Sequence, residues 1–347
     1  MSEQTNADFR SDTLTRPDAA MRQAMAEAVV GDDVFGEDPT IHELEAEAAS
    51  FLGQAAALFV PSGTMANQIA IHGHCRSGDE MICEERSHVF LYEAGAAARW
   101  SGTHCRTFPS ETGFATPELI QPLLREDDPH QPISRLLLIE NTHNMAGGRV
   151  LQAAGMAELI DFAHSHEMRV HVDGARLANA AVAAGIAAAD LVQGVDSVSL
   201  CFSKGLGAPV GSVVAGSEDF IRMARRTRKA LGGGMRQVGV LGAAALLALR
   251  EGPGRLAVDH ARARQVAAAV GSLGPIQVDE SSVETNIVMV DTPGQDAQDF
   301  VEFLAERGIF ALAFGPSRIR MVFHRDLTDE HVQRCIEAMT HWARQQS

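Results

Sequence analysis

Lysine is nearly missing from this chain: it occurs only as Lys204 and Lys229 among 29 basic residues, and arginine supplies the rest. Chemistry that requires a lysine amine therefore has two candidates. Basic charge is also in deficit, because 45 acidic residues give a formal net charge of −16. Nucleic acids and anionic membranes attract basic surfaces, so neither is expected as the main partner.

Cysteine is scarce too, with five residues scattered through the chain and no Cys-x-x-Cys pair. We expect free thiols in a reducing cytoplasm and no zinc site built on cysteines. No run of about 18 apolar residues is present, so no transmembrane helix is expected. The polar first ten residues predict no signal peptide.

The length of 347 residues and the 46% hydrophobic content predict a globular chain of two domains. Short β-rich runs alternate with helical stretches through the middle of the chain. This alternation predicts an α/β fold with a mostly parallel sheet sandwiched by helices, which binds its ligand at the carboxyl ends of the strands. The expected strands are 57–60, 80–84, 135–139, 169–172, 197–201 and 211–215.

The pattern changes near Gly252, after which a long helix over 254–272 leads into alternating strands and helices. This pattern predicts a smaller α+β domain at the C-terminus. We therefore expect an N-terminal segment that packs with the small domain, then the large domain, then the small domain, over 1–45, 46–252 and 253–347.

Two motifs follow expected strands. Lys204, in Ser-Lys-Gly-Leu-Gly, comes just after the apolar run 198–202, where a long amine can reach a cofactor aldehyde and form a Schiff base. Asp173 ends the strand at 169–172 and could keep a pyridine nitrogen protonated. Each motif is also compatible with an ordinary turn or helix cap. Because one helix and one strand fit between them, both should lie at the same edge of the sheet.

Five further features are candidates for ligand contacts or proton transfer. The segment 61–67 follows a strand and opens a helix, which favours a phosphate site over simple N-capping. His88, His130 and His143 are candidates for proton transfer, although a lone histidine is often structural. Arg320 alternates with apolar residues on a strand, where it could bind a carboxylate or face solvent.

Together these motifs resemble the L-threonine aldolase family of pyridoxal 5′-phosphate enzymes, of low-specificity type, with the aspartate aminotransferase fold (fold type I). The resemblance covers nearly the whole chain and is carried by segments 9–17, 31–39, 61–67, 140–144, 171–176, 203–212 and 232–237. It implies a lyase that cleaves L-threonine, L-allo-threonine and related β-hydroxy amino acids to glycine and an aldehyde. It also implies a homo-oligomer, a dimer of dimers, with shared active sites.

The resemblance further implies roles at matching positions. Lys204 would hold the cofactor as a Schiff base, Asp173 would pair with the pyridine nitrogen, and His88 would stack on the ring. The other implied contacts are with the phosphate (Gly63, Thr64), the ring oxygen (Arg176), the cofactor at large (Ser203), the substrate carboxylate (Ser11, Arg320), the substrate hydroxyl (His130) and a neighbouring subunit's cofactor site (Lys229, Arg236).

Two positions depart from the family pattern or vary within it, and they leave substrate preference open. Phe35 stands where the family often has tyrosine, and Tyr92 falls near the expected substrate pocket, where relatives vary. The sequence assigns no metal ion.

Other reactions on the same fold remain alternatives, namely β-elimination, racemisation and transamination, because the fold alone does not choose among them. A nicotinamide dehydrogenase is disfavoured because the glycines at 205–211 lack the GxGxxG spacing and come late in the chain. A non-catalytic regulator that binds pyridoxal phosphate would need a DNA-binding domain, and no basic helical module precedes residue 50.

Overall fold

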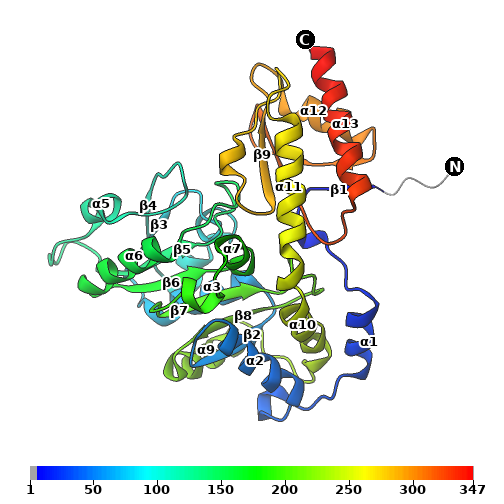
Figure 1. The fold of residues 1–347 in the computed structure, drawn as a ribbon. Helices are drawn as coiled ribbons and strands as arrows, with labels where there is room; N and C mark the ends of the chain where they lie inside the picture. The colour runs from blue at the N-terminus through cyan, green and yellow to red at the C-terminus, as the bar shows by residue number, and fades with distance from the viewer. Residues whose placement is uncertain (1–5, 347) are drawn as a thin grey trace.

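The computed structural model describes residues 6–346. The polar N-terminal stretch, expected to carry no signal peptide, therefore lies partly outside the described residues. The chain forms two lobes, a larger one around a seven-stranded sheet and a smaller one around a three-stranded antiparallel sheet (Figure 1). Helix α11 (Leu256–Val270) runs from the junction into the smaller lobe (Figure 1). The predicted α/β fold class is confirmed.

The large sheet has the strand order β2-β8-β7-β6-β5-β3-β4. Its strands are β2 (Ala56–Val60), β3 (Glu80–Glu84), β4 (His104–Phe108), β5 (Ser134–Glu140), β6 (Arg169–Asp173), β7 (Ser197–Cys201) and β8 (Ser212–Gly216). Neighbours are parallel except β8, which runs antiparallel to β2 and β7. Every residue of β3, β7 and β8 is buried, as a sheet covered on both faces requires.

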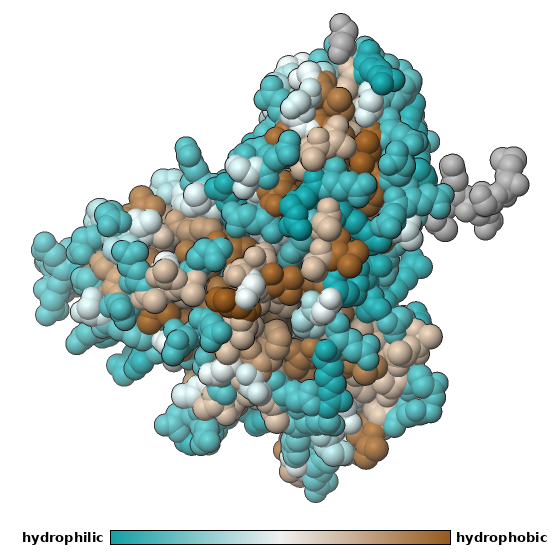
Figure 2. Space-filling view, in the orientation of Figure 1, coloured by the Kyte–Doolittle hydropathy of each residue, from teal (hydrophilic) through white to brown (hydrophobic). Residues whose placement is uncertain are grey.

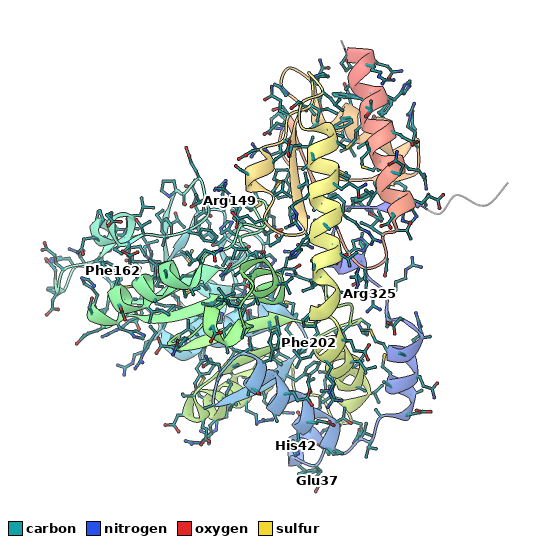
Figure 3. All side chains as sticks on the ribbon, in the orientation of Figure 1. Glu37, His42, Arg149, Phe162, Phe202 and Arg325 are labelled. Carbon is teal, nitrogen blue, oxygen red and sulfur yellow. The ribbon has the colours of Figure 1, made fainter. Side chains whose placement is uncertain are left out.

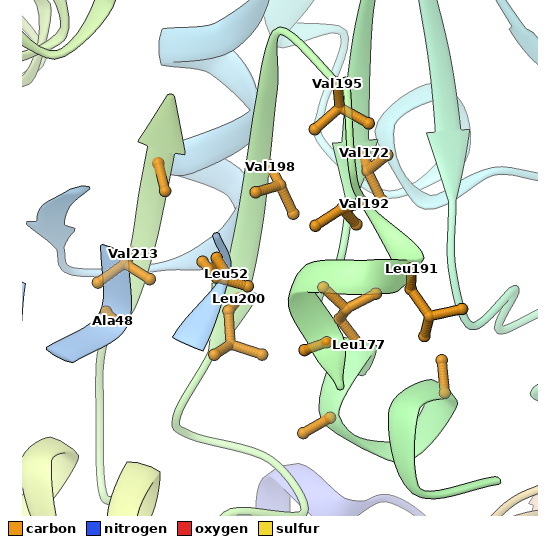
Figure 4. Close-up of a cluster of buried hydrophobic side chains, with 14 of the residues drawn as sticks. Ala48, Leu52, Val172, Leu177, Leu191, Val192, Val195, Val198, Leu200 and Val213 are labelled. Carbon is orange, nitrogen blue, oxygen red and sulfur yellow. The ribbon is translucent and has the colours of Figure 1, made fainter. Parts of the chain in front are cut away.

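Helices cover both faces of this sheet. On one face, α3 (Gly63–His74) and α9 (Glu218–Ala230) share an apolar core with β2 and β8. The other face carries α2 (Pro39–Phe51), α6 (Ala153–Ser165), α7 (Leu177–Ala184) and α8 (Ala188–Leu191). Figure 4 shows Leu177 and Leu191 in this second core with Val172 of β6 and with Val198 and Leu200 of β7. Each such fully buried side chain contributes about 1.5–3 kcal/mol to stability.

The smaller lobe has its own apolar core. It contains β9 (Ile287–Asp291), α12 (Ala297–Ala305), β10 (Ile309–Phe310), β11 (Leu312–Ala313), β12 (Arg318–Val322) and α13 (Asp329–Gln346). The first strand of the described chain, β1 (Ala7–Asp8), pairs in parallel with β10. The N-terminal segment continues along the smaller lobe as far as Asp18, which pairs with Arg325.

The rest of that segment packs elsewhere, because α1 (Ala19–Glu27) contacts α10 (Gly239–Glu251) and α2 contacts β2. Since α10 ends at Glu251, we propose a boundary between the lobes near residue 252. Other short helical elements include α4 (His88–Leu91), a π-helical turn (Ala97–Ser101) and α5 (Pro117–Ile120).

Within the described residues, no helix combines the length and apolar character needed to span a bilayer. On the face shown in Figure 2, hydrophilic residues cover the ends of both lobes, and apolar residues gather toward the middle, where the lobes meet.

Candidate active site

The candidate site lies at the carboxyl edge of the large sheet. Asp173 is the last residue of β6, and β7 ends at Cys201, three residues before Lys204. Because β6 and β7 are parallel neighbours, these ends lie side by side. Figure 3 places Phe202, two residues before Lys204, near the middle of the molecule. The predicted lysine and aspartate are therefore brought together.

Asp173 is held as a buried, charged carboxylate. It is 3% exposed, accepts a hydrogen bond from the side-chain amide of Asn67 at 2.7 Å, and accepts another from the backbone N–H of Ala175 at 3.1 Å. Burial raises the pKa of Asp173, but the positive charges of Lys204 and then His88 outweigh it and leave the pKa below its ordinary value. An ionised aspartate at this edge is suited to a protonated pyridine nitrogen.

His88 begins α4 beside this carboxylate. Its Nδ1 lies 3.0 Å from the buried carboxylate of Glu93, so Nδ1 carries the proton and Nε2 stays available on the other side of the ring. The hydrogen bond to Glu93 raises the pKa of His88 above its ordinary value. The backbone N–H of His88 donates to Glu140 at 2.6 Å, which fixes the start of α4 against the end of β5.

A buried ion pair joins the N-terminal segment to the large sheet. Arg176 donates two hydrogen bonds to Asp12, at 2.8 and 2.7 Å, and both residues are buried. Burial raises the pKa of Asp12, but Arg176 and then Lys204 outweigh it and lower the pKa to about 2. Ser11 precedes Asp12 and caps the turn at Asp12–Leu14. The ion pair therefore also holds Ser11 near this edge of the sheet.

Arg320, on β12, is a buried cation with an unused donor. It is 8% exposed, and its two terminal nitrogens donate to Asn144 at 2.9 Å and to the carbonyl of Arg10 at 3.1 Å. Its Nε is buried and has no hydrogen-bond partner among the described residues. Burial and the neighbouring charge of Arg176 lower the pKa of Arg320 to about 10. An anionic ligand would satisfy this cation.

Tyr92 lies close to this arginine. Its phenol is half exposed, donates to the sulfur of Met145 at 3.3 Å, and interacts electrostatically with Arg320. Its ring lies 5.7 Å from that of His88. Tyr92 therefore lies beside both the histidine and the arginine.

The start of α3 offers backbone N–H donors at the same edge of the sheet. Ser62 caps the helix by accepting from the backbone N–H of Met65, and Gly63 and Thr64 follow in its first turn, half-buried. The N–H groups of a first turn have no partner within the helix. A side chain at Gly63 would come within 2.8 Å of the Cys201 sulfur, so glycine lets α3 approach the end of β7. Ser203, also half-buried, follows that strand.

Three predicted residues lie apart from this group. His130 precedes β5, whose seven residues span about 20 Å before reaching the site edge at Glu140. Its side chain is 90% exposed and pairs with Asp128. Lys229, at the end of α9, is exposed. Arg236 is 55% exposed, pairs with Asp32 at 3.0 Å and lies over the exposed Phe35 ring. The structure of the single chain does not bring these three to Lys204.

The donor set fits pyridoxal phosphate. The site offers a lysine amine for the aldehyde, a buried carboxylate for the pyridine nitrogen, a helix start for the phosphate and an arginine for a substrate carboxylate. His88, Glu93 and Asp173 also place ligand atoms within 4.8 Å of one another, a spacing that a metal ion could use. Those atoms already bond to one another or to Asn67, which favours the organic cofactor.

Glu93 and several pairings within the site gave no signal in the sequence. Glu93 is an isolated acid, and it becomes central only because it accepts from His88, Asn67 and Gln68. Asp12 and Arg176 stand 164 residues apart. Asn144 stood in the motif at 140–144, but its bond to Arg320 spans 176 residues. Such pairings depend on the tertiary fold, so no local pattern could have identified them.

Comparison with known proteins agrees with this geometry. A family model described as beta-eliminating lyase matches residues 8–293. A probable low-specificity L-threonine aldolase of Arabidopsis thaliana is 44% identical over 344 residues, which cover 96% of this chain and 97% of that protein. The structure of Leishmania major threonine aldolase has a TM-score of 0.83 at 20% identity, over 97% of this chain and 99% of that one. A structure of SPT with pyridoxal phosphate has a TM-score of 0.77 at 18% identity, over 98% and 88% of the two chains.

Proposed function

Because the chain belongs to the beta-eliminating lyase family and, within it, to the low-specificity threonine aldolases, we propose a role for each residue of its site. The protein is a pyridoxal-phosphate-dependent carbon–carbon lyase. It cleaves L-threonine, L-allo-threonine and related L-β-hydroxy amino acids to glycine and an aldehyde. The observation that carries this conclusion is the pairing of Lys204 with the buried, ionised Asp173 at one sheet edge.

When bound, pyridoxal phosphate supplies an aldehyde that takes up amines and a ring that accepts the electron pair of the broken Cα–Cβ bond. Lys204 is the amine that holds this aldehyde between turnovers. Asp173 keeps a proton on the pyridine nitrogen. The first turn of α3, with Gly63 and Thr64, binds the phosphate together with Ser203, and Arg176 contacts the ring oxygen.

The remaining residues orient the substrate. Arg320 and Ser11 bind its carboxylate, which fixes the direction of the bond to be broken. The buried Nε of Arg320 is the donor that such a carboxylate would satisfy. His88 stacks on the ring, and its Nε2 takes the proton of the β-hydroxyl. Tyr92 lines the side-chain end of the pocket.

A product assay tests the reaction. The purified protein with pyridoxal phosphate and L-threonine should yield glycine and acetaldehyde in equal amounts. β-Elimination would instead yield 2-oxobutanoate and ammonia. If 2-oxobutanoate forms faster than glycine, the aldolase assignment is wrong and the alternative reaction holds.

We also propose a homo-oligomer, a dimer of dimers, whose sites are shared between subunits. Lys229, Arg236 and the 74%-exposed Phe35 support this arrangement, since each is exposed on the single chain. His130, likewise exposed, would act near the substrate hydroxyl from a neighbouring copy. Closed C2 contacts are the commonest way to pair such surfaces.

Complementation tests the shared sites. Lys204→Ala and Arg236→Ala variants, each inactive alone, should regain part of their activity when they are unfolded together and refolded as mixed oligomers. A fully active monomer in sedimentation would refute the proposal.

A reducing cytoplasm remains the proposed compartment, supported by five free cysteines, four of them buried.

A further inference from the structure

A line of buried polar side chains runs from Asp173 through the core between α3 and the sheet. Asn67, on α3, bonds Asp173, and its amide oxygen lies 3.2 Å from Nε2 of His171, in the middle of β6. Nδ1 of His171 lies 2.8 Å from Ser197 Oγ, at the start of β7. Ser197 Oγ lies 2.8 Å from Nε2 of His74, the last residue of α3.

The proton positions along this line follow from its inner end. The amide nitrogen of Asn67 contacts two carboxylates, Glu93 at 2.9 Å and Asp173 at 2.7 Å, so this nitrogen must be the donor and the amide oxygen must face His171. Nε2 of His171 therefore carries hydrogen. Burial lowers the pKa of His171 to about 3, so its imidazole is neutral at neutral pH and Nδ1 is an acceptor.

The hydrogen positions in the outer half of this line, at Ser197 and His74, then follow. Ser197 must donate its hydroxyl hydrogen to Nδ1 of His171 and accept from Nε2 of His74. Burial lowers the pKa of His74 to about 4, so this imidazole is neutral as well. Every bond thus points the same way, from His74 toward Asp173. His74 itself borders a cavity of about 470 Å³ at the opposite sheet edge, with His164 and Arg169 in its wall.

Apolar side chains could fill the space between α3 and the sheet, so the polar side chains found there call for an explanation. Asn67, His171 and Ser197 are at most 1% exposed, and burying polar groups costs stability unless they are hydrogen-bonded. Aligned hydrogen bonds polarise one another, and bonds donated to a carboxylate favour its charged form. We propose that the donor line from His74 through Ser197, His171 and Asn67 positions the Asp173 carboxylate and keeps it charged for the cofactor nitrogen. This inference rests on the role assigned to Asp173 above.

Ser197→Ala breaks the line at its middle with little change in volume. Ser199→Ala is the matched control: Ser199 is equally buried on β7 and donates to the Asn67 oxygen at 3.3 Å, but its loss leaves the line intact. We expect Ser197→Ala to weaken the binding of pyridoxal phosphate and to lower kcat by about fivefold each, the effect of one net hydrogen bond. The KM for threonine should stay unchanged, Ser199→Ala should have a smaller effect, and Ser197→Thr should restore the wild-type values.

A double-mutant cycle separates this role from a structural one. In an Asp173→Asn background, Ser197→Ala should cause no further loss of cofactor affinity, because the group it acts on is gone. Ser197→Ala should also lower the melting temperature of the apo-protein more than Ser199→Ala does, because it removes two buried hydrogen bonds instead of one. Equal losses of cofactor affinity in both backgrounds, or equal effects of the two serine variants on cofactor affinity and kcat, would overturn the inference. If the wild-type protein bound no pyridoxal phosphate, the proposed function would fail with it.

Discussion

Replacing Arg320 with lysine tests the carboxylate pocket most directly. Arg320→Lys keeps the positive charge but removes the planar set of donors. In the protein, two of those donors contact Asn144 and the Arg10 carbonyl, and Nε remains for a ligand. A lysine ammonium is a single point of charge and cannot make all three contacts in one plane.

The expected loss follows from one missing hydrogen bond. A bond between a charged donor and a carboxylate contributes about 1.5–3 kcal/mol. Since about 1.4 kcal/mol corresponds to a factor of ten, kcat/KM for threonine should fall by roughly 10–150-fold. Most of the change should appear in KM. Cofactor affinity should stay within about twofold of wild type, because no cofactor contact is assigned to Arg320.

Steady-state kinetics and an absorbance titration with pyridoxal phosphate measure the two quantities separately. Arg318→Lys is the control: Arg318 lies on the same strand, is 45% exposed and pairs with Asp291 at the surface. That variant should behave like wild type. The reasoning fails if Arg320→Lys weakens cofactor binding while the KM for threonine is unchanged.

Four further substitutions test the remaining roles. Lys204→Ala should abolish both the visible absorbance of lysine-bound cofactor and glycine formation, whereas Lys229→Ala should keep that absorbance; a borohydride-trapped adduct on Lys229 would contradict the assignment. Asp173→Asn should keep the fold and some cofactor but lower kcat by about 100-fold, the loss of a strong charged hydrogen bond; near-normal glycine production would remove Asp173 from the mechanism. Glu93→Gln removes the group that raises the pKa of His88. Because the imidazole must be neutral to accept a proton, the acidic limb of the kcat/KM profile should move to lower pH, and an unmoved limb would exclude His88 as the base.

Much of the large lobe could be predicted from sequence, because its parallel strands are short apolar runs. The expected strands 80–84 and 197–201 match β3 and β7 to the residue, and the others differ by one residue at one or both ends. Strand β4 was missed because its sequence, His-Cys-Arg-Thr-Phe, mixes polar and apolar residues, as an edge strand can. Strands β1 and β10 are two residues each and exist only through their mutual pairing.

The site was predictable where function places a residue at the end of a strand or within a few residues of it. Lys204 and Asp173 both have that position, and parallel topology then brings them together. The residues that hold them in place were not predictable. Asn67 bonds Asp173 across 106 residues, and Glu93 reaches Asn67 across 26. Such contacts depend on how α3 lies on the sheet, which no local pattern reveals.

The parallel pairing of β1 with β10 also sets an order of events during synthesis. Strand β1 leaves the ribosome first, yet its partner follows about 300 residues later. At a synthesis rate of about 5–20 residues per second, β1 is without its partner strand for roughly 15–60 s. The cofactor contacts proposed within the chain lie between Gly63 and Lys204, so that part of the site can form early. The place for the substrate carboxylate needs Ser11 and Arg320, and therefore it forms last.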